Sequence, residues 1–150
     1  MKLKLKNQTI LITGSGSGIG RGIADGFLKE GASVIITDLN KKSLLKTAEE
    51  FSNQYSEEKI LSFFGNLNNP DILELLYQFI IDEAGGVDHL VCNIGSGKSV
   101  PPLDEDVPEF QRMLDINLLN AVGIVNKLFP LLEKSVSKDA CFPSITFVGS

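Results

Sequence analysis

The chain has 150 residues, of which 43% are hydrophobic and 22% charged, and its formal net charge is −5 at pH 7. These values are typical of one globular domain with its own core, and the length excludes two domains of ordinary size. The acidic balance excludes a broad basic surface for nucleic acid or for an anionic membrane.

The N-terminal segment, residues 1–6, is basic, but polar residues and glycines follow it at once. It therefore lacks the apolar core of a signal peptide. No uninterrupted apolar run is long enough to cross a bilayer. We expect a cytoplasmic protein with no membrane partner.

Strand-like and helix-like segments alternate through the first part of the chain. The continuous apolar run 9–13 ends in glycines and is typical of a strand buried on both faces of a parallel sheet. Residues 19–30 have helical spacing. A second strand is expected over 33–37, closed by Asp38, and a second helix over 41–55.

The same alternation continues to the end. A third strand is expected over 60–64, and a helix that starts near Pro70 runs to about residue 84. The fourth and fifth strands are expected at 89–92 and 144–148. This order predicts right-handed crossovers and an α/β fold in one domain, residues 1–150. We expect a Rossmann-type doubly wound parallel sheet with strand order 3-2-1-4-5.

A long helix is expected between the last two strands, over 108–135. It is apolar almost all round beyond Ile116, which indicates burial against the sheet and a second surface. Pro130 should bend it, because proline removes one backbone hydrogen bond. The amount of apolar surface favours a homo-oligomer formed through this helix.

The loop between the first strand and the first helix reads Thr-Gly-Ser-Gly-Ser-Gly-Ile-Gly over 13–20. Glycines let the backbone approach a ligand closely, and the helix start offers free N–H groups to a pyrophosphate. A tight turn without a ligand is the alternative, but the strand before it and the helix after it favour dinucleotide binding. The contacts expected in this loop are Gly14, Ser15, Ser17, Gly18, Ile19 and Gly20.

Asp38, at the end of the second strand, is placed to accept hydrogen bonds from the adenosine ribose hydroxyls. A 2′-phosphate there would be repelled by the carboxylate, and Ser17 offers no compensating positive charge. We therefore expect NAD as cofactor and NADP less. The alternative is that Asp38 or Asn40 caps the following helix, and both roles could coexist.

Taken together, these residues resemble the short-chain dehydrogenase/reductase family, whose glycine pattern 13–20 matches. The resemblance covers essentially the whole chain. It implies an oxidoreductase that transfers hydride between NAD(H) and a small carbonyl or alcohol substrate. It also implies that the long helix pairs across a two-fold axis.

Two further stretches carry the resemblance to cofactor-binding positions. Residues 65–67 are similar to the family's adenine-contacting Asp-Val pair, with Asn66 in place of the acid. Residues 92–95 are similar to the family's Asn-Asn-Ala-Gly element, of which only Asn93 and Gly95 carry over. The implied cofactor contacts are Asn66, Leu67, Asn93 and Gly95.

Two catalytic residues are implied by the resemblance. Residues 115–118 resemble the helical segment whose Asn belongs to the catalytic tetrad, so Asn117 would hold a water that links the active-site Lys to solvent. Without the resemblance, a mid-helix Asn is more often structural. Ser150 matches the Ser that hydrogen-bonds the substrate carbonyl or hydroxyl, although a terminal Ser is otherwise commonplace.

The family places its Tyr and Lys beyond the position of Ser150, and neither Tyr55 nor Tyr77 has the Tyr-x-x-x-Lys spacing. We therefore expect a truncated form of the family fold, with the fifth strand as an exposed edge and no turnover by the chain alone. A non-catalytic dinucleotide-binding or assembly module is the alternative.

The substrate stays open among sugars, steroids, acyl compounds and small alcohols. Lys98 is either a solvated loop residue or a group that attracts an anion. No metal site is expected, because His89 is the single histidine. Cys92 and Cys141 form no CxxC pair and are expected as buried, reduced thiols.

Overall fold

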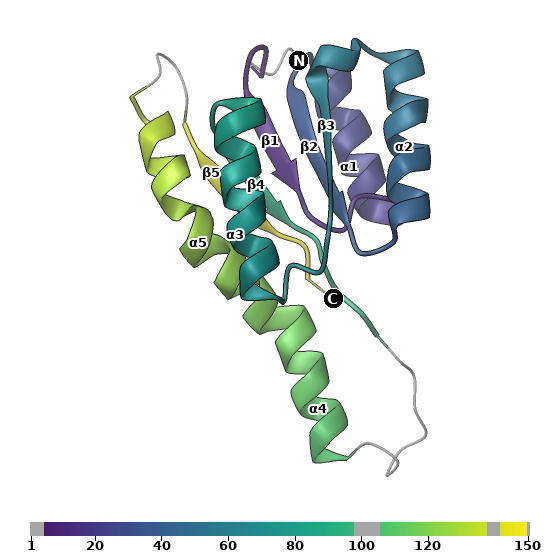
Figure 1. Cartoon of the computed structure of the whole chain (residues 1–150), viewed down its shortest axis with the longest axis vertical. Helices are drawn as coiled ribbons and strands as arrows, with labels where there is room; N and C mark the ends of the chain where they lie inside the picture. The colour runs from purple at the N-terminus through teal and green to yellow at the C-terminus, as the bar shows by residue number, and fades with distance from the viewer. Residues whose placement is uncertain (1–4, 98–105, 138–141, 150) are drawn as a thin grey trace.

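The computed structural model describes residues 5–97, 106–137 and 142–149. Within them, five strands form one parallel sheet in the order β3-β2-β1-β4-β5, so the predicted topology is confirmed (Figure 1). The strands are β1 (Thr9–Ile12), β2 (Ser33–Asp38), β3 (Ile60–Phe64), β4 (His89–Cys92) and β5 (Ser144–Phe147).

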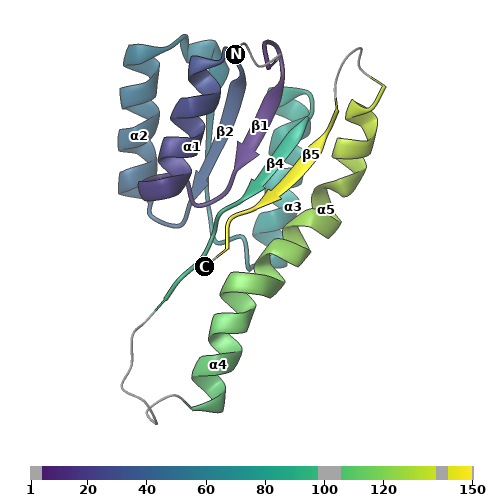
Figure 2. The same cartoon turned by 180° about the vertical axis from the view of Figure 1, so that it is seen from behind.

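Helices cover both faces of this sheet, because the strands are apolar on both sides. On one face Ile10, Val34 and Ile36 pack in a cluster with residues of α1 (Gly18–Lys29) and α2 (Lys41–Gln54). On the other, Leu11, Ile35 and Leu90 pack with residues of α3 (Pro70–Phe79) and α5 (Asn120–Ser135). Figures 1 and 2 show the two layers from opposite sides. Neighbouring strand residues point to opposite faces, which explains the continuous apolar runs.

Asparagine side chains cap the N-termini of two helices and so determine where these helices begin. Asn40 accepts a hydrogen bond from Ser43 N at the start of α2, and Asn69 accepts one from Asp71 N at the start of α3, where Pro70 follows the cap. The segment 70–84 was expected as one helix, but hydrogen bonding widens to a π turn, η2 (Ile80–Ala84), before Gly85 ends it with φ +70°.

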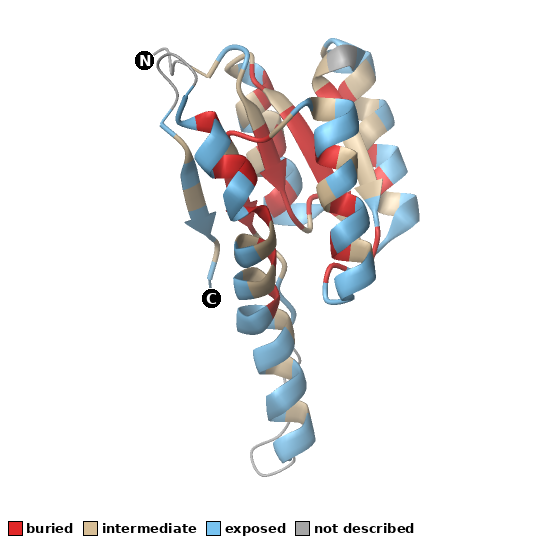
Figure 3. Cartoon of the chain, turned by 60° about the vertical axis from the view of Figure 1, so that its left-hand side comes forward, coloured by how far each residue is buried: buried red, intermediate tan, exposed pale blue. Residues whose placement is uncertain are grey.

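The long helix is divided into three parts. The helix α4 (Val107–Leu114) is followed by a π turn, η3 (Asp115–Leu119), and then by α5. The change of hydrogen bonding lies at η3, whereas α5 passes through Pro130 as one helix. Figure 3 shows buried residues where α5 meets the sheet and mainly exposed ones along α4. One side of the helix stays exposed in the single chain (Leu118, Leu119, Val122 and Phe129), so the expected burial against a second surface stays a prediction.

The fifth strand lies at the edge of the sheet and ends at Phe147, one residue before the predicted end. Val148 N still donates to Cys92 O at 2.9 Å. Cys92 is a buried, free thiol, as predicted, while Cys141 lies outside the described residues. None of the helices in the described ranges is both long and apolar enough to cross a membrane.

Candidate functional site

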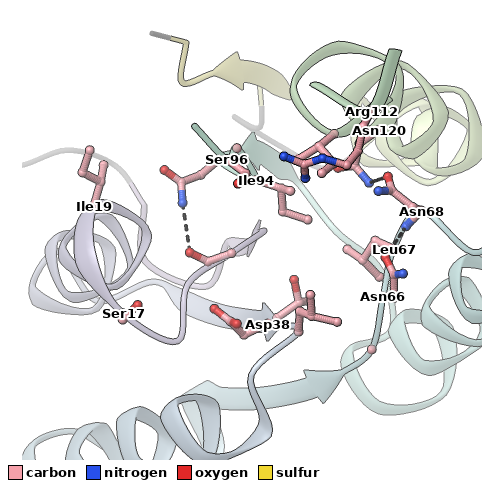
Figure 4. A pocket seen from close by; sticks show the side chains of 17 residues that line it. Ser17, Ile19, Asp38, Asn66, Leu67, Asn68, Ile94, Ser96, Arg112 and Asn120 are labelled. Carbon is pink, nitrogen blue, oxygen red and sulfur yellow. Dashed lines mark hydrogen bonds between the residues drawn. The ribbon is translucent and has the colours of Figure 1, made fainter. Parts of the chain in front are cut away.

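A cavity of about 670 Å³ opens where four neighbouring strands end. Its walls come from the loops after β1 and β4, the end of β2, the segment after β3, and α4 with the turns that follow it (Figure 4). Ligands of doubly wound folds bind at this edge, near the point where strand order reverses. The predicted residues that line the cavity are Gly14, Ser17, Ile19, Asp38, Asn66, Leu67, Asn93 and Gly95.

The glycine loop after β1 is held to the sheet by hydrogen bonds of the Ser15 side chain. Ser15 is fully buried, and its Oγ donates to Ile12 O at 2.7 Å and accepts from Thr37 N at 3.0 Å. The Ser15 side chain therefore holds the turn in place and does not line the cavity. Gly14 and Gly18 have φ near +60°, a conformation that glycine adopts without strain.

Gly20 lets the first turn of α1 pass close to two neighbouring loops. A Cβ on this residue would lie 2.4 Å from Gly14 O and 2.5 Å from Asn93 Nδ2. Any larger residue would push the loop after β1 away from the loop after β4. Gly20 does not line the cavity, so its contribution is to this close packing.

Asn93 connects the same two loops by hydrogen bonds. Its Nδ2 donates to Thr13 O at 3.2 Å and to Gly14 O at 3.0 Å, and its backbone N donates to Thr13 Oγ1 at 2.9 Å. Both amide hydrogens are thus directed at the glycine loop. Asn93 lines the cavity, but its side chain acts by positioning that loop.

Asp38 lies at the cavity with both carboxylate oxygens engaged by backbone. Gly16 N donates to Oδ2 at 2.9 Å, and Asn40 N donates to Oδ1 at 2.8 Å. The cap of α2 is Asn40, so of the two residues considered for capping only Asn40 has that role. The Asp38 carboxylate is held in a fixed orientation at the cavity wall.

A second group of amides lies after β3. Asn66 Oδ1 accepts from Asn68 N at 3.1 Å, and Asn120 Nδ2 donates to Asn68 Oδ1 at 2.5 Å. Leu67 between them is buried. Arg112 lines the cavity beside them (Figure 4). It forms an ion pair with Glu109 at 2.7 Å.

Asn117 does not line the cavity itself, but it holds a segment that does. Ser96 N donates to Asn117 Oδ1 at 2.8 Å, and Asn117 Nδ2 donates to Ser96 O at 3.0 Å. This residue lies in the π turn η3, and such turns are common at functional sites. Its side chain therefore fixes the loop after β4 against the long helix.

Several cavity residues were not predicted from the sequence (Thr37, Leu39, Gly65, Asn68, Ile94, Arg112, Ile116 and Asn120). The residue spacing in the sequence could have indicated three of them. Arg112, Ile116 and Asn120 are four residues apart, so they share one helical face. Lys98 and Ser150 lie outside the described residues.

Cys92, at the end of β4, is buried and does not line the cavity. Burial raises the pKa of the Cys92 thiol to about 11, so the thiolate is scarce at neutral pH. Among the described residues, no group of three or more His, Cys, Asp or Glu side chains could hold a metal ion.

The residues present fit a dinucleotide. The Ser17 hydroxyl makes no capping bond at the start of α1, so it and the first N–H groups of this helix are available to an anion. Thr37, another lining residue, has a buried hydroxyl oxygen with no hydrogen-bond partner in the described chain. Ile19 is 68% exposed at the same edge, which leaves an apolar side chain for a ligand to cover.

Sequence comparison gives a family match. The family described as short chain dehydrogenase matches residues 8–140. The chain is 29% identical over 143 residues to an (S)-acetoin-forming diacetyl reductase of Staphylococcus epidermidis, which covers 95% of this chain and 55% of that protein. The chain spans about half the length of the curated relatives it matches.

Solved structures share the fold. A 7α-hydroxysteroid dehydrogenase complexed with NADH and 7-oxo glycochenodeoxycholic acid superposes with a TM-score of 0.80 at 29% identity, over 89% of this chain and 51% of that one. L-Sorbose reductase from Gluconobacter frateurii, complexed with NADPH and L-sorbose, superposes with a TM-score of 0.82 at 25% identity, over the same shares.

Proposed function

Since this chain belongs to the short-chain dehydrogenase family, we propose that the protein transfers hydride between a nicotinamide dinucleotide and a small carbonyl or alcohol substrate. The observation that carries the proposal is the cavity at the ends of β1 to β4, with the glycine loop and Asp38 on its wall. Bound dinucleotide would supply the hydride, and the protein would bind and orient it.

The start of α1 is the proposed pyrophosphate site. Ser17 and the free backbone N–H groups that follow it supply donors, and the helix dipole favours negative charge there. Ser15 and Gly20 support this site from behind, through the bonds and close packing of the loop. Asn66, Leu67 and Gly95 line other parts of the cavity and are proposed as further cofactor contacts.

We propose NAD over NADP. The Asp38 carboxylate is fixed by Gly16 N and Asn40 N, so it cannot turn away from an approaching 2′-phosphate without breaking both bonds. The related structures carry NADH in one case and NADPH in the other, so the choice here rests on Asp38.

The catalytic roles proposed for Asn117 and Ser150 follow from the family pattern. Asn117 would hold a water that links the active-site Lys to solvent, and its bonds to Ser96 position the loop after β4. Ser150 would meet the substrate oxygen. Neither tyrosine of the chain is placed as the acid/base. Tyr55 donates to Asp25 Oδ1 at 2.6 Å, and this bond raises its pKa to about 12. Tyr77 lies on α3 beneath Lys127, outside the cavity lining. We therefore propose that the 150 residues alone turn over no substrate.

A homo-oligomer through the long helix is also proposed. Its support is the apolar side left exposed along η3 and α5 (Leu118, Leu119, Val122 and Phe129). Exposed apolar side chains gathered along one helix favour association in water. A second copy brings the same face, as two-fold pairing requires.

Titration of the purified protein with NAD(H) and NADP(H), by calorimetry, tests the cofactor proposal. Saturable binding of either dinucleotide supports it, and absence of binding by both contradicts it. Oxidation of NADH with a panel of ketones and aldehydes, followed by absorbance of the reduced nicotinamide, tests turnover. Turnover by the 150 residues alone would contradict the expected inactivity.

A further inference from the structure

Asn66 lies directly after β3 and lines the cavity with an exposed side chain. Its Oδ1 accepts a hydrogen bond from Asn68 N at 3.1 Å. This side chain makes no other hydrogen bond to the described residues. Figure 4 shows Asn66, Leu67 and Asn68 together on the side of the cavity opposite Ser17 and Ile19.

The orientation of the Asn66 amide follows from this bond. Asn68 N is a backbone donor and needs an acceptor, so the oxygen of the amide faces it and the nitrogen does not. The two Nδ2 hydrogens are left for a ligand. A carboxylate at the same position could also accept from Asn68 N, but its second oxygen would be another acceptor.

The neighbouring groups offer few free acceptors to a ligand. Asn68 Oδ1 already accepts from Asn120 Nδ2. The Arg112 guanidinium lines the same cavity and can only donate, and its Nε and Nη2 already donate to Glu109. A ligand group that carries acceptors is therefore better matched to this wall than one that carries only donors.

We propose that the base subsite of this protein accepts a 6-oxo purine as readily as adenine. This inference rests on the proposed function. Adenine presents the acceptor N1 beside its 6-amino donor, and a 6-oxo purine presents a carbonyl acceptor at position 6. Asn66 Nδ2 can donate to either acceptor. A carboxylate that faces position 6 would accept from the amino group of adenine but would repel the carbonyl oxygen of a 6-oxo purine, whose donor on this edge is N1–H.

The probe is nicotinamide hypoxanthine dinucleotide, which differs from NAD at the 6-position of the purine. Titration of the purified protein with both compounds should give dissociation constants within about threefold of each other. Asn66→Asp should raise the dissociation constant for the hypoxanthine compound, relative to that for NAD, by about tenfold or more, because a donor to the carbonyl oxygen is replaced by a carboxylate oxygen that repels it. Asn69→Asp is the control, since Asn69 caps α3 and does not line the cavity.

The outcomes separate the two proposals. Binding of neither compound overturns the proposed function and this inference with it. If the wild type binds NAD but binds the hypoxanthine compound about tenfold or more weakly than NAD, the base inference alone is overturned. Such a difference is on the order of one lost hydrogen bond. An unchanged ratio of the two dissociation constants in Asn66→Asp also overturns it, because Asn66 would then not contact the group at position 6 of the purine.

Discussion

The side-chain amide of Asn117 and the backbone of Ser96 exchange two hydrogen bonds, at 2.8 and 3.0 Å, across the space between η3 and the loop after β4. Asn117 Oδ1 accepts from Ser96 N, and Asn117 Nδ2 donates to Ser96 O. An isolated mid-helix Asn would bond to its own backbone or to water. Here it connects two separate walls of the cavity.

Asn117→Asp keeps the bond from Ser96 N but places an oxygen against Ser96 O. We expect the free energy of unfolding to fall by about 1–2 kcal/mol, because a donor is lost and two acceptors face each other. Urea denaturation measures this change. Asn53→Asp, at an exposed position of α2, is the control and should change the free energy little. Equal losses in the two variants would contradict the Asn117–Ser96 clamp.

Asp38→Ala should narrow the difference between the dissociation constants of NAD and NADP, because the carboxylate that repels the 2′-phosphate is removed. We expect the ratio to shift by about tenfold, the size of one charge–charge or hydrogen-bond contact. Asp38→Asn is the matched variant, since it keeps an acceptor for Gly16 N and removes the charge. Tighter binding of NADP than NAD by the wild type would refute the cofactor preference.

Replacement by alanine should change the free energy of unfolding in opposite directions at two glycines of α1. Gly20→Ala puts a Cβ 2.4 Å from Gly14 O and should lower the free energy of unfolding by about 1–3 kcal/mol, as overpacking does. Gly22 has no atom within 4 Å of such a Cβ, so Gly22→Ala should raise it by about 0.5–1 kcal/mol through helix propensity. Urea denaturation of both variants checks the pair, and a tolerated Gly20→Ala would be inconsistent with the close packing.

His89 should make stability depend on pH. Its ring bonds to Ser144 Oγ at 2.8 Å and to Gln8 Oε1 at 2.6 Å, and burial lowers its pKa from the ordinary 6.5, partly opposed by Asp88. Because the folded-state pKa is the lower one, this contribution is complete above about pH 6.5 and is lost as pH falls through the folded pKa.

The measurement is the free energy of unfolding of the wild type and of His89→Gln at pH 7.5 and at pH 6, above and below the ordinary histidine pKa of about 6.5. The wild type should lose more stability than the variant on acidification. His89 is the single histidine of the chain, so no other imidazole contributes. A larger loss in the variant would reverse the proposed sign.

Phe129→Glu should weaken self-association if copies pair through the long helix. Phe129 is 47% exposed on α5, and a charge there would be desolvated in the interface. Leu45→Glu on α2, where Leu45 is 52% exposed, is the control away from this helix. Sedimentation velocity of the wild type and the two variants measures the oligomeric state of each. Dissociation by Leu45→Glu, with Phe129→Glu unaffected, would place the interface elsewhere.

The strand and helix pattern was predictable from the sequence because it depends on local periodicity. β3 and β4 coincide with their predicted ranges. Alternation predicts a parallel sheet with right-handed crossovers, and the order β3-β2-β1-β4-β5 is the usual one of the dinucleotide-binding fold that the glycine loop indicates. The glycine loop and Asp38 were also predictable, since both lie directly at strand ends that parallel strands bring to one edge.

The tertiary structure alone decided which side chains hold the site together. The π turn at Asp115–Leu119 has no strong local signal, and it sets which residues of the long helix face the cavity. Ser15 was expected to contact the cofactor, yet its hydroxyl holds the turn to Ile12 and Thr37. The partners Asn117 and Ser96, or Asn120 and Asn68, are far apart in sequence. Such pairs form only when the packed sheet and helices bring them together, because a side-chain hydrogen bond depends on distance in space and leaves no periodic pattern in the chain.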